Sequence, residues 1–338
     1  MPVISKHEKL VFNPNEFDFE TQLLEFGLYL VLGKPRSGKT TVSRLISQHL
    51  KSRNVAQAVV IAGNQKIKKD WAEIVHPMYI HDGFSLEPDA KGKDKSAQVA
   101  IAALDQIIKE QQGREALCDA EGCAFPKEWE LNLFIDDCGS METFMRSAPM
   151  KWISNNRRQI HCTVFINIQK FTQAWTSTRE AADGVICLQT GCADTIKGLH
   201  KGYVSTIPFH AFETVLCGAT ENRGFLVINC HPERHILEHM LFFGHTDFLH
   251  KDGYKARLEK IGSPELWADA EKKYKPPVAQ LTRKQLQIVE SITPEKQLED
   301  SDQEEEQPKE PVIPHFTGQS FAQGAMTVHF HRRAAAAG

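Results

Sequence analysis

Six apolar segments of five or six residues recur along the chain, and each has the length and composition of a buried β-strand. They are residues 28–32, 58–62, 131–135, 163–168, 184–188 and 224–228. The first, LYLVL, is followed at once by a glycine-rich turn and then by a helical pattern over residues 41–50. This order of strand, turn and helix recurs in outline along the first 230 residues.

The segments between these strands differ in pattern. Apolar residues at helical spacing predict an amphipathic helix over residues 96–110, whereas residues 64–95 are polar and rich in turn formers. Strands that alternate with helices and long loops imply a mostly parallel sheet with helices on both faces. The expected fold class is therefore α/β, and ligands of such sheets bind at the carboxyl ends of the strands.

Four regions are expected along the chain. Residues 1–26 form an N-terminal lead-in with a short amphipathic segment, and residues 27–245 form the α/β core. Residues 246–291 are expected to be a helical extension of this core. Residues 292–338 are an acidic linker and tail, predicted to be disordered because acids, Gln and Pro dominate over residues 304–314.

Composition and charge narrow the classes of function. The chain has 338 residues, 41% of them hydrophobic, and no apolar run of eighteen residues that would span a membrane. Its N-terminus lacks the apolar stretch of a signal peptide, and eight cysteines scattered among strands indicate reduced thiols. The net charge is -3; residues 295–310 carry -6, so the remainder carries +3. A nearly neutral body neither indicates nor excludes a nucleic-acid partner.

The turn after the first strand carries a phosphate-binding pattern, G-x-x-x-x-G-K-[ST]. Its residues are Gly33, Lys34, Pro35, Arg36, Ser37, Gly38, Lys39 and Thr40, with Thr41 next in the helix. Backbone N–H groups of such a loop surround phosphate oxygens, which requires glycine where the chain turns sharply. The lysine then reaches the β- and γ-phosphates and the threonine hydroxyl coordinates Mg²⁺. The sequence therefore predicts an ATP and Mg²⁺ site.

The second half of such a site is a strand that ends in acidic residues. Residues 131–135 are followed by Asp136 and Asp137. We expect Asp136 to hold Mg²⁺ through its outer coordination sphere, and Asp137 to orient or polarise the attacking water. The alternative interpretation is that Asp137 only caps a helix.

A third element resembles one protein family. Residues 152–189 contain a basic polar turn, a strand that ends in Gln169, and Arg179 about ten residues later. Over residues 25–230 this order of motifs resembles the FtsK/HerA superfamily, and most closely the genome-packaging ATPases of poxviruses, giant viruses and virophages. The resemblance implies a RecA-like P-loop NTPase fold, with Gln169 as a sensor of the γ-phosphate. It also implies that Arg179 is an arginine finger acting in a neighbouring subunit.

Two positions depart from the family pattern. Cellular relatives usually end the acidic pair in Glu, where this chain has Asp137, and the viral branch accepts Asp. The turn Asn155-Asn156-Arg157-Arg158 has Arg where many relatives carry His, so a subunit contact and a DNA contact are both open. Arg157, Arg158 and Arg223 are rival candidates for the finger, and the first two also fit a solvated face.

The function implied by this resemblance is ATP-driven translocation of double-stranded DNA by a homo-oligomeric ring, which packages a viral genome into a preformed capsid. Its partners would be double-stranded DNA, further copies of the chain and capsid proteins at a packaging vertex. The expected location is the host cytoplasm, in a viral factory, and the virion. Two alternatives stay open: another P-loop enzyme such as a small-molecule kinase, and a nucleotide-gated interaction protein with little turnover.

Overall fold

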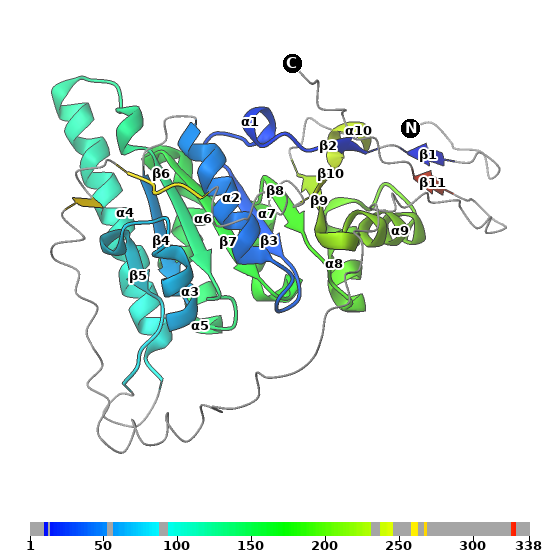
Figure 1. Ribbon diagram of the computed structural model, residues 1–338. Helices are drawn as coiled ribbons and strands as arrows, with labels where there is room; N and C mark the ends of the chain where they lie inside the picture. The colour runs from blue at the N-terminus through cyan, green and yellow to red at the C-terminus, as the bar shows by residue number, and fades with distance from the viewer. Residues whose placement is uncertain are drawn as a thin grey trace, which may run out of the picture.

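The computed structural model describes residues 10–12, 14–52, 57–87, 94–230, 237–245, 258–262, 267–268 and 326–328. Most of the described chain forms one sheet with helices on both faces (Figure 1). Within the described ranges, no helix combines the length and the hydrophobicity needed to cross a bilayer. Nearly all of residues 269–338, which include most of the predicted acidic linker and tail, lie outside the described residues.

The described sheet has nine strands in the order β2-β10-β9-β8-β3-β7-β6-β4-β5. Their bounds are β2 (Asn15–Glu16), β3 (Leu28–Leu32), β4 (Gln57–Ala62), β5 (Ile80–Asp82), β6 (Leu131–Asp136), β7 (Cys162–Ile168), β8 (Gly184–Cys187), β9 (Gly224–Asn229) and β10 (Leu241–His245). The six strands from β8 to β5 run parallel, and β9 is antiparallel to both β8 and β10. The expected α/β class with a mostly parallel sheet is confirmed. A separate two-stranded sheet pairs β1 (Leu10–Phe12) with β11 (Met326–Val328).

Two hydrophobic layers enclose the sheet. The helices are α1 (Phe19–Gln22), α2 (Lys39–Ser52), α3 (Gln65–Trp71), α4 (Ser96–Glu121), α5 (Glu142–Met145), α6 (Ala148–Asn156), α7 (Thr176–Glu180), α8 (Ala193–Tyr203), α9 (Phe209–Ala219) and α10 (Leu237–Met240). Residues of α2 and α3 pack on one face, and residues of α4, α6, α8 and α9 pack on the other. Every residue of β3, β6, β7 and β9 is buried, which explains why apolar residues dominate these strands.

The polar stretch 64–95 contains structure that its pattern does not reveal. Helix α3 lies there, followed by the 3₁₀ turn η1 (Pro77–Tyr79) and the edge strand β5. The helix is only seven residues long, too short for a clear periodicity, and it is held by Trp71, which packs on Phe134 at 4.8 Å between ring centroids. Tertiary packing, not local pattern, therefore forms this segment.

Helix α4 continues eleven residues beyond the predicted end at residue 110, to Glu121. The extension is polar in sequence, yet Gln111 is buried and its amide donates to the carbonyls of Trp129 and Ile160 at 3.0 and 3.1 Å. Gly122 then ends the helix with a left-handed conformation, at φ 64°.

Of residues 246–291, predicted to be a helical extension, the structure describes 258–262 and 267–268. The first of these segments is not helical and packs on α2 and α3. Glu259 exchanges hydrogen bonds with the Gln48 side chain, and the N–H of Ile261 donates to the carbonyl of Ile74 at 2.7 Å.

A buried arginine fixes the amino end of the central strands. Arg157, in the 3₁₀ turn η3 (Arg157–Ile160), is buried; it is in an ion pair with Asp183 and also donates to the carbonyl of Ala181 at 3.2 Å. Asp183 also accepts the backbone N–H of Leu28 at 2.8 Å, which ties the turn to the start of β3. Arg158 reaches the same carboxylate at 3.0 Å, but its side chain is 61% exposed. The solvated-face interpretation therefore holds for Arg158 and is wrong for Arg157.

This difference gives a stability prediction. We expect Arg157→Leu to lower the free energy of unfolding by about 3 kcal/mol, because it removes the buried cation that neutralises Asp183 and the donor to the carbonyl of Ala181. Arg158→Leu is the matched control and should cost less than about 1 kcal/mol, because its partner is shared and it is exposed. Urea denaturation of both variants checks this. Equal losses would show that burial of Arg157 does not stabilise the fold.

Candidate functional site

The predicted phosphate-binding loop joins the end of β3 to the start of α2. Its first backbone N–H groups are fixed by the neighbouring strands: Gly33 donates to the carbonyl of Ile168 at 3.2 Å, and Lys34 to that of Gln189 at 3.1 Å. The loop therefore lies between the carboxyl ends of β7 and β8. Lys34, Pro35 and Arg36 are exposed at its tip, and Thr40 and Thr41 lie in the first turn of α2.

The two glycines are required by the shape of the loop. Gly38 has φ 97°, a conformation that side chains rarely adopt. A Cβ added at Gly33 would lie 2.9 Å from the Cβ of Leu188, so a larger residue would push the loop away from β8. Arg36 also has a positive φ, of 63°, so the strained turn continues through the tip.

The surroundings of Lys39 and Ser37 show whether this loop could bind phosphate. The Lys39 ammonium donates to the carbonyls of Gly33 and Lys34 at 2.8 and 3.0 Å, so it is folded onto the loop itself. Burial lowers the pKa of Lys39, and the nearby carboxylates of Asp136 and Asp137 oppose that shift. The Ser37 hydroxyl is buried and has no hydrogen-bond partner among the described residues. A bound triphosphate would satisfy the Ser37 hydroxyl and offset the burial of the ammonium, so these residues fit it.

Asp136 is held at the end of β6 by a buried hydrogen-bond network. Its carboxylate accepts from the indole N–H of Trp71 at 2.9 Å and from the amide of Asn167 at 2.7 Å. The Ser43 hydroxyl donates to Asn167 at 2.9 Å, which connects the network to α2. The side chain of Asp136 is also hydrogen-bonded to that of Thr40.

This network bears on how Asp136 would act on Mg²⁺. Burial raises the pKa of the Asp136 carboxyl, and the hydrogen bonds from Trp71, Asn167 and Thr40 act against that shift. Both carboxylate oxygens already accept a hydrogen bond. The arrangement fits the outer-sphere role expected from the sequence, with the Thr40 hydroxyl as the direct protein ligand.

Asp137 lies beside Asp136 in a left-handed conformation, at φ 60°. Its carboxylate accepts from the amide of Asn64 on one oxygen and from the amide of Gln169, at 3.3 Å, on the other. A Cβ at Gly63 would collide with the backbone of Asp137, so only glycine allows β4 to approach this turn. No helix begins at Asp137, and α5 starts at Glu142, so the helix-cap alternative is wrong. Strained backbone at a hydrogen-bonded carboxylate is typical of catalytic positions.

Gln169 follows β7 and lies between the two halves of the site. Its backbone N–H donates to the side-chain oxygen of Gln173 at 2.7 Å, and the N–H of Lys170 donates to the same oxygen at 3.1 Å. Gln173 thereby fixes the turn from which the Gln169 amide reaches Asp137. The structure brings together Lys39, Thr40, Asp136, Asp137 and Gln169 at one edge of the sheet, as the sequence predicted.

Four residues of this site were missed by sequence reasoning: Asn64, Trp71, Asn167 and Gln173. A signal existed for two of them. Asn64 comes directly after the second apolar strand and its glycine, at the carboxyl edge, and Asn167 is a polar residue inside an apolar strand. The roles of Trp71 and Gln173 depend on contacts between distant elements and have no local signal.

Asn64 has two separate roles, which give a second prediction. Its side-chain oxygen accepts the N–H of Ile67 at 3.0 Å and caps α3, while its amide donates to Asp137. Asn64→Ser keeps a capping oxygen but cannot reach Asp137 as the amide does. We expect kcat for ATP hydrolysis to fall about tenfold, with a loss of stability below about 1 kcal/mol. Asn64→Ala should lose both properties, so the two variants should share the lower kcat and differ in melting temperature, and equal melting temperatures would contradict this division.

Arg179 lies on α7, and the described contacts of its side chain are with residues outside the nucleotide site. Its guanidinium donates to the Thr176 hydroxyl at 3.1 Å and stacks on the ring of Phe171 at 4.8 Å. The hydroxyl of Tyr203 donates to its backbone carbonyl at 2.7 Å. Arg179 is therefore not brought to the site of its own chain. Among its rivals, Arg157 is engaged at the amino end of the sheet, and Arg223 is exposed in η5 (Glu221–Arg223), which leads into β9.

No family model matches the chain, and no curated protein matches it. Among solved structures, the DNA-packaging ATPase B204 of Sulfolobus turreted icosahedral virus is 14% identical, with 66% of this chain and 98% of that chain covered and a TM-score of 0.44. The genome-packaging NTPase B204 of Sulfolobus turreted icosahedral virus 2, in complex with ATP-gammaS, is 13% identical, with 65% and 97% covered and a TM-score of 0.43.

A further structure is not viral. The cytoplasmic domain of the type VII secretion ATPase EccC of Thermomonospora curvata is 12% identical, with 68% of this chain and 26% of that chain covered and a TM-score of 0.45. Identities and TM-scores as low as these do not establish a function, so the function of this chain has to be argued from its own residues.

Proposed function

We propose that this protein is a Mg²⁺-dependent ATPase that moves double-stranded DNA as a homo-oligomeric ring, and that it packages a viral genome into a preformed capsid. The observation that supports the ATPase activity is the convergence of Lys39, Thr40, Asp136, Asp137 and Gln169 at the carboxyl edge of one sheet. ATP and Mg²⁺ are its cofactors.

The reaction is attack of water on the γ-phosphorus, with cleavage of the bond to the β-phosphate oxygen and release of ADP and phosphate. Lys39 and the backbone N–H groups of the loop hold the β- and γ-phosphates. Thr40 and, through the outer sphere, Asp136 would hold Mg²⁺, which would neutralise charge that develops on the phosphates. Asp137 orients the water and accepts its proton, and the Gln169 amide positions Asp137 and senses the γ-phosphate.

Arg179 would complete the site of a neighbouring subunit. A guanidinium matches phosphate oxygens and stays charged, so a finger supplied in trans makes turnover depend on assembly. The position of Arg179 outside its own site supports such a role. The partners in this proposal are double-stranded DNA, further copies of the chain and capsid proteins, and the location is the host cytoplasm and the virion.

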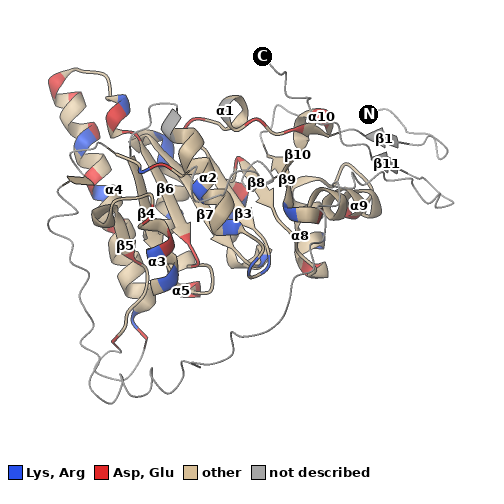
Figure 2. Ribbon diagram, in the orientation of Figure 1, with Lys and Arg blue, Asp and Glu red and all other residues tan. Residues whose placement is uncertain are grey.

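DNA contacts in this proposal go mainly to phosphates. Lys34 and Arg36 are exposed on the loop between β3 and α2, where Figure 2 shows basic residues, as it does on α3. Elsewhere, as on α4, Lys and Arg alternate with Asp and Glu (Figure 2). Binding would then weaken with salt and be indifferent to DNA sequence.

Steady-state ATP hydrolysis, measured with and without double-stranded DNA at several protein concentrations, tests the proposal. We expect the turnover per subunit to rise with DNA and with protein concentration, because each site is completed by a neighbour. Turnover that depends on Lys39 but ignores both DNA and concentration would favour a small-molecule kinase or another P-loop enzyme. Nucleotide binding without turnover would favour a nucleotide-gated interaction protein.

A further inference from the structure

Two cysteines meet at the carboxyl end of α4. Gly122 ends this helix in a left-handed conformation, and two hydrogen bonds close the turn. The N–H of Cys123 donates to the carbonyl of Cys118 at 3.0 Å, and that of Gly122 donates to the carbonyl of Asp119 at 3.3 Å. These two bonds define the Schellman motif, in which the side chains of the first and last residues contact each other. In this chain both contacting positions are cysteine.

The backbone of this turn places the two cysteines within the span of a disulfide. The Cys123 nitrogen and the Cys118 oxygen are 3.0 Å apart, and one bond on one side and two on the other connect them to Cα atoms, so the Cα atoms lie within about 7 Å. Disulfides join Cα atoms that are about 4.4–6.8 Å apart. The side chains also face each other, because the thiol of Cys118 is hydrogen-bonded to that of Cys123. An S–S bond between them therefore requires little movement of the backbone.

The two thiols differ in exposure, which sets the order in which they would react. Cys123 is exposed, whereas Cys118 is buried, with 2% of its surface accessible. Burial, together with the hydrogen bond to Cys123, raises the pKa of the Cys118 thiol to about 11. Because an external reagent reaches only the exposed sulfur, Cys123 is the first nucleophile. Cys118 would react second, and only with the sulfur of Cys123.

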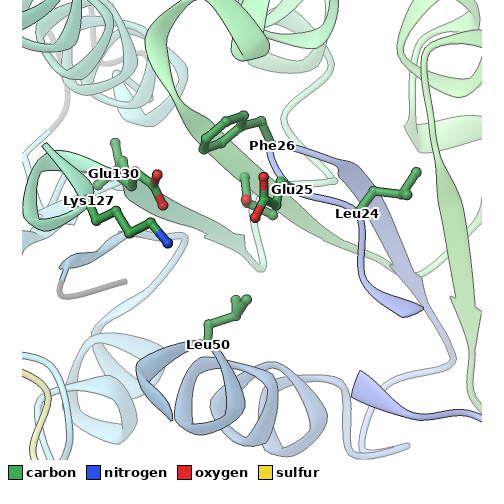
Figure 3. Close-up of a pocket in the computed structure, with 8 residues that line it drawn as sticks. Leu24, Glu25, Phe26, Leu50, Lys127 and Glu130 are labelled. Carbon is green, nitrogen blue, oxygen red and sulfur yellow. The ribbon is translucent and has the colours of Figure 1, made fainter. Parts of the chain in front are cut away.

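The segment that follows Cys123 is anchored on the sheet. The ring of Phe125 stacks on that of His161, with 4.1 Å between the ring centroids. The chain then continues to Lys127 and Glu130, which line a hollow where β6 and β7 begin (Figure 3). The cysteine pair is therefore held in place at the amino end of the central strands, whereas the nucleotide site lies at their carboxyl end.

A second cysteine pair with the same spacing allows an internal comparison. Cys187 and Cys192 are also five residues apart, but Cys187 is buried in the strand β8 and Cys192 is exposed just before α8. Within the described residues, no hydrogen bond joins these two thiols. Hydrogen bonds with Thr195 lower the pKa of Cys192, so this thiol is itself reactive. The two pairs share a spacing and an exposed thiol, and they differ in thiol–thiol contact.

We propose that Cys118 and Cys123 form a redox-active pair that closes to an intramolecular disulfide by exchange with a small-molecule disulfide such as glutathione disulfide. The Cys123 thiolate attacks one sulfur of the oxidant, whose S–S bond breaks, and one glutathione leaves as a thiolate. Cys118 then gives its proton to solvent and attacks the Cys123 sulfur, and the second glutathione leaves. Two protein thiols are oxidised and one glutathione disulfide is reduced to two glutathione molecules. The site does not rest on the proposed ATPase activity.

Equilibration of the full chain in glutathione redox buffers, followed by acid quenching and tryptic mass mapping, tests the proposal. Residues 115–127 form one tryptic peptide whose two cysteines are Cys118 and Cys123, and residues 180–197 form a matched peptide with Cys187 and Cys192. We expect the first peptide to lose two hydrogens and carry no glutathione, and the second to carry one glutathione. In the same buffer, the ratio of disulfide-bonded to unbonded peptide should be at least about tenfold higher for residues 115–127.

Variants and a denaturant separate this pair from ordinary thiol chemistry. Cys118→Ser should retain one glutathione on Cys123, because no second thiol releases it. Cys123→Ser should leave the buried Cys118 unmodified. In urea the two peptides should form disulfides within about threefold of each other, because the spacing is equal and only the fold brings one pair into contact. Glutathione that persists on Cys123 of the native wild type, equal disulfide formation in both native peptides, or a tenfold preference that survives in urea would overturn the proposal.

Discussion

Asp137→Asn is expected to lower kcat for ATP hydrolysis by about 10²–10⁴-fold while ATP still binds. The amide keeps the shape of the carboxylate but cannot accept the proton of the attacking water. The backbone should not move, because Asn accepts the left-handed conformation found at this position, φ 60°, as well as Asp does. Single-turnover hydrolysis and the dissociation constant of a fluorescent ATP analogue measure the two properties separately.

Two controls make this result specific. Asp105→Asn makes the same substitution on the exposed face of α4, where Asp105 only pairs with Lys109, and should leave kcat unchanged. Asp137→Glu keeps a carboxylate on a side chain one methylene longer, so it should retain part of the activity that Asp137→Asn loses. If Asp137→Asn retains more than a tenth of the wild-type turnover, Asp137 is not the general base.

Arg179→Ala is expected to lower turnover by about 10³–10⁵-fold if Arg179 acts in the site of a neighbour. The variant should bind ATP normally, because the guanidinium contacts Thr176 and Phe171 and not the loop of its own chain. Arg146→Ala is the matched control, since Arg146 also stacks on an aromatic ring, that of Trp175, at 4.3 Å. Its removal should change turnover less than about threefold.

Mixing inactive variants decides whether the arginine acts in trans. In an equimolar mixture of Arg179→Ala and Asp137→Asn subunits, some sites combine an intact Asp137 with an intact Arg179 from the neighbour. Activity should therefore reappear in this mixture. A mixture of Lys39→Ala and Asp137→Asn should stay inactive, because every site then carries a defect of its own. No recovery in the first mixture, with oligomers formed, would exclude Arg179 as the trans finger and direct the same test to Arg223 and Arg158.

The sequence by itself determined the chemistry of the nucleotide site. The order of strand, glycine-rich loop and helix identified Lys39 and Thr40, because phosphate binding requires these residue types at a fixed spacing within one continuous segment. The acidic end of β6 and the glutamine after β7 could also be found, because each directly follows an apolar strand. Both features consist of consecutive residues, so they can be recognised from the sequence alone.

Only the tertiary structure decided which distant residues meet. Asp136 is held by Trp71 of α3 and Asn167 of β7, and Asp137 by Asn64, because β6 lies between β7 and β4 in the sheet. Strand order follows from how the helices pack on both faces, and no single segment encodes it. The same holds for the burial of Arg157 against Asp183, and for Glu25 and Glu130, which face one hollow from segments more than a hundred residues apart. These contacts depend on long-range packing, which hydrophobic periodicity alone does not specify.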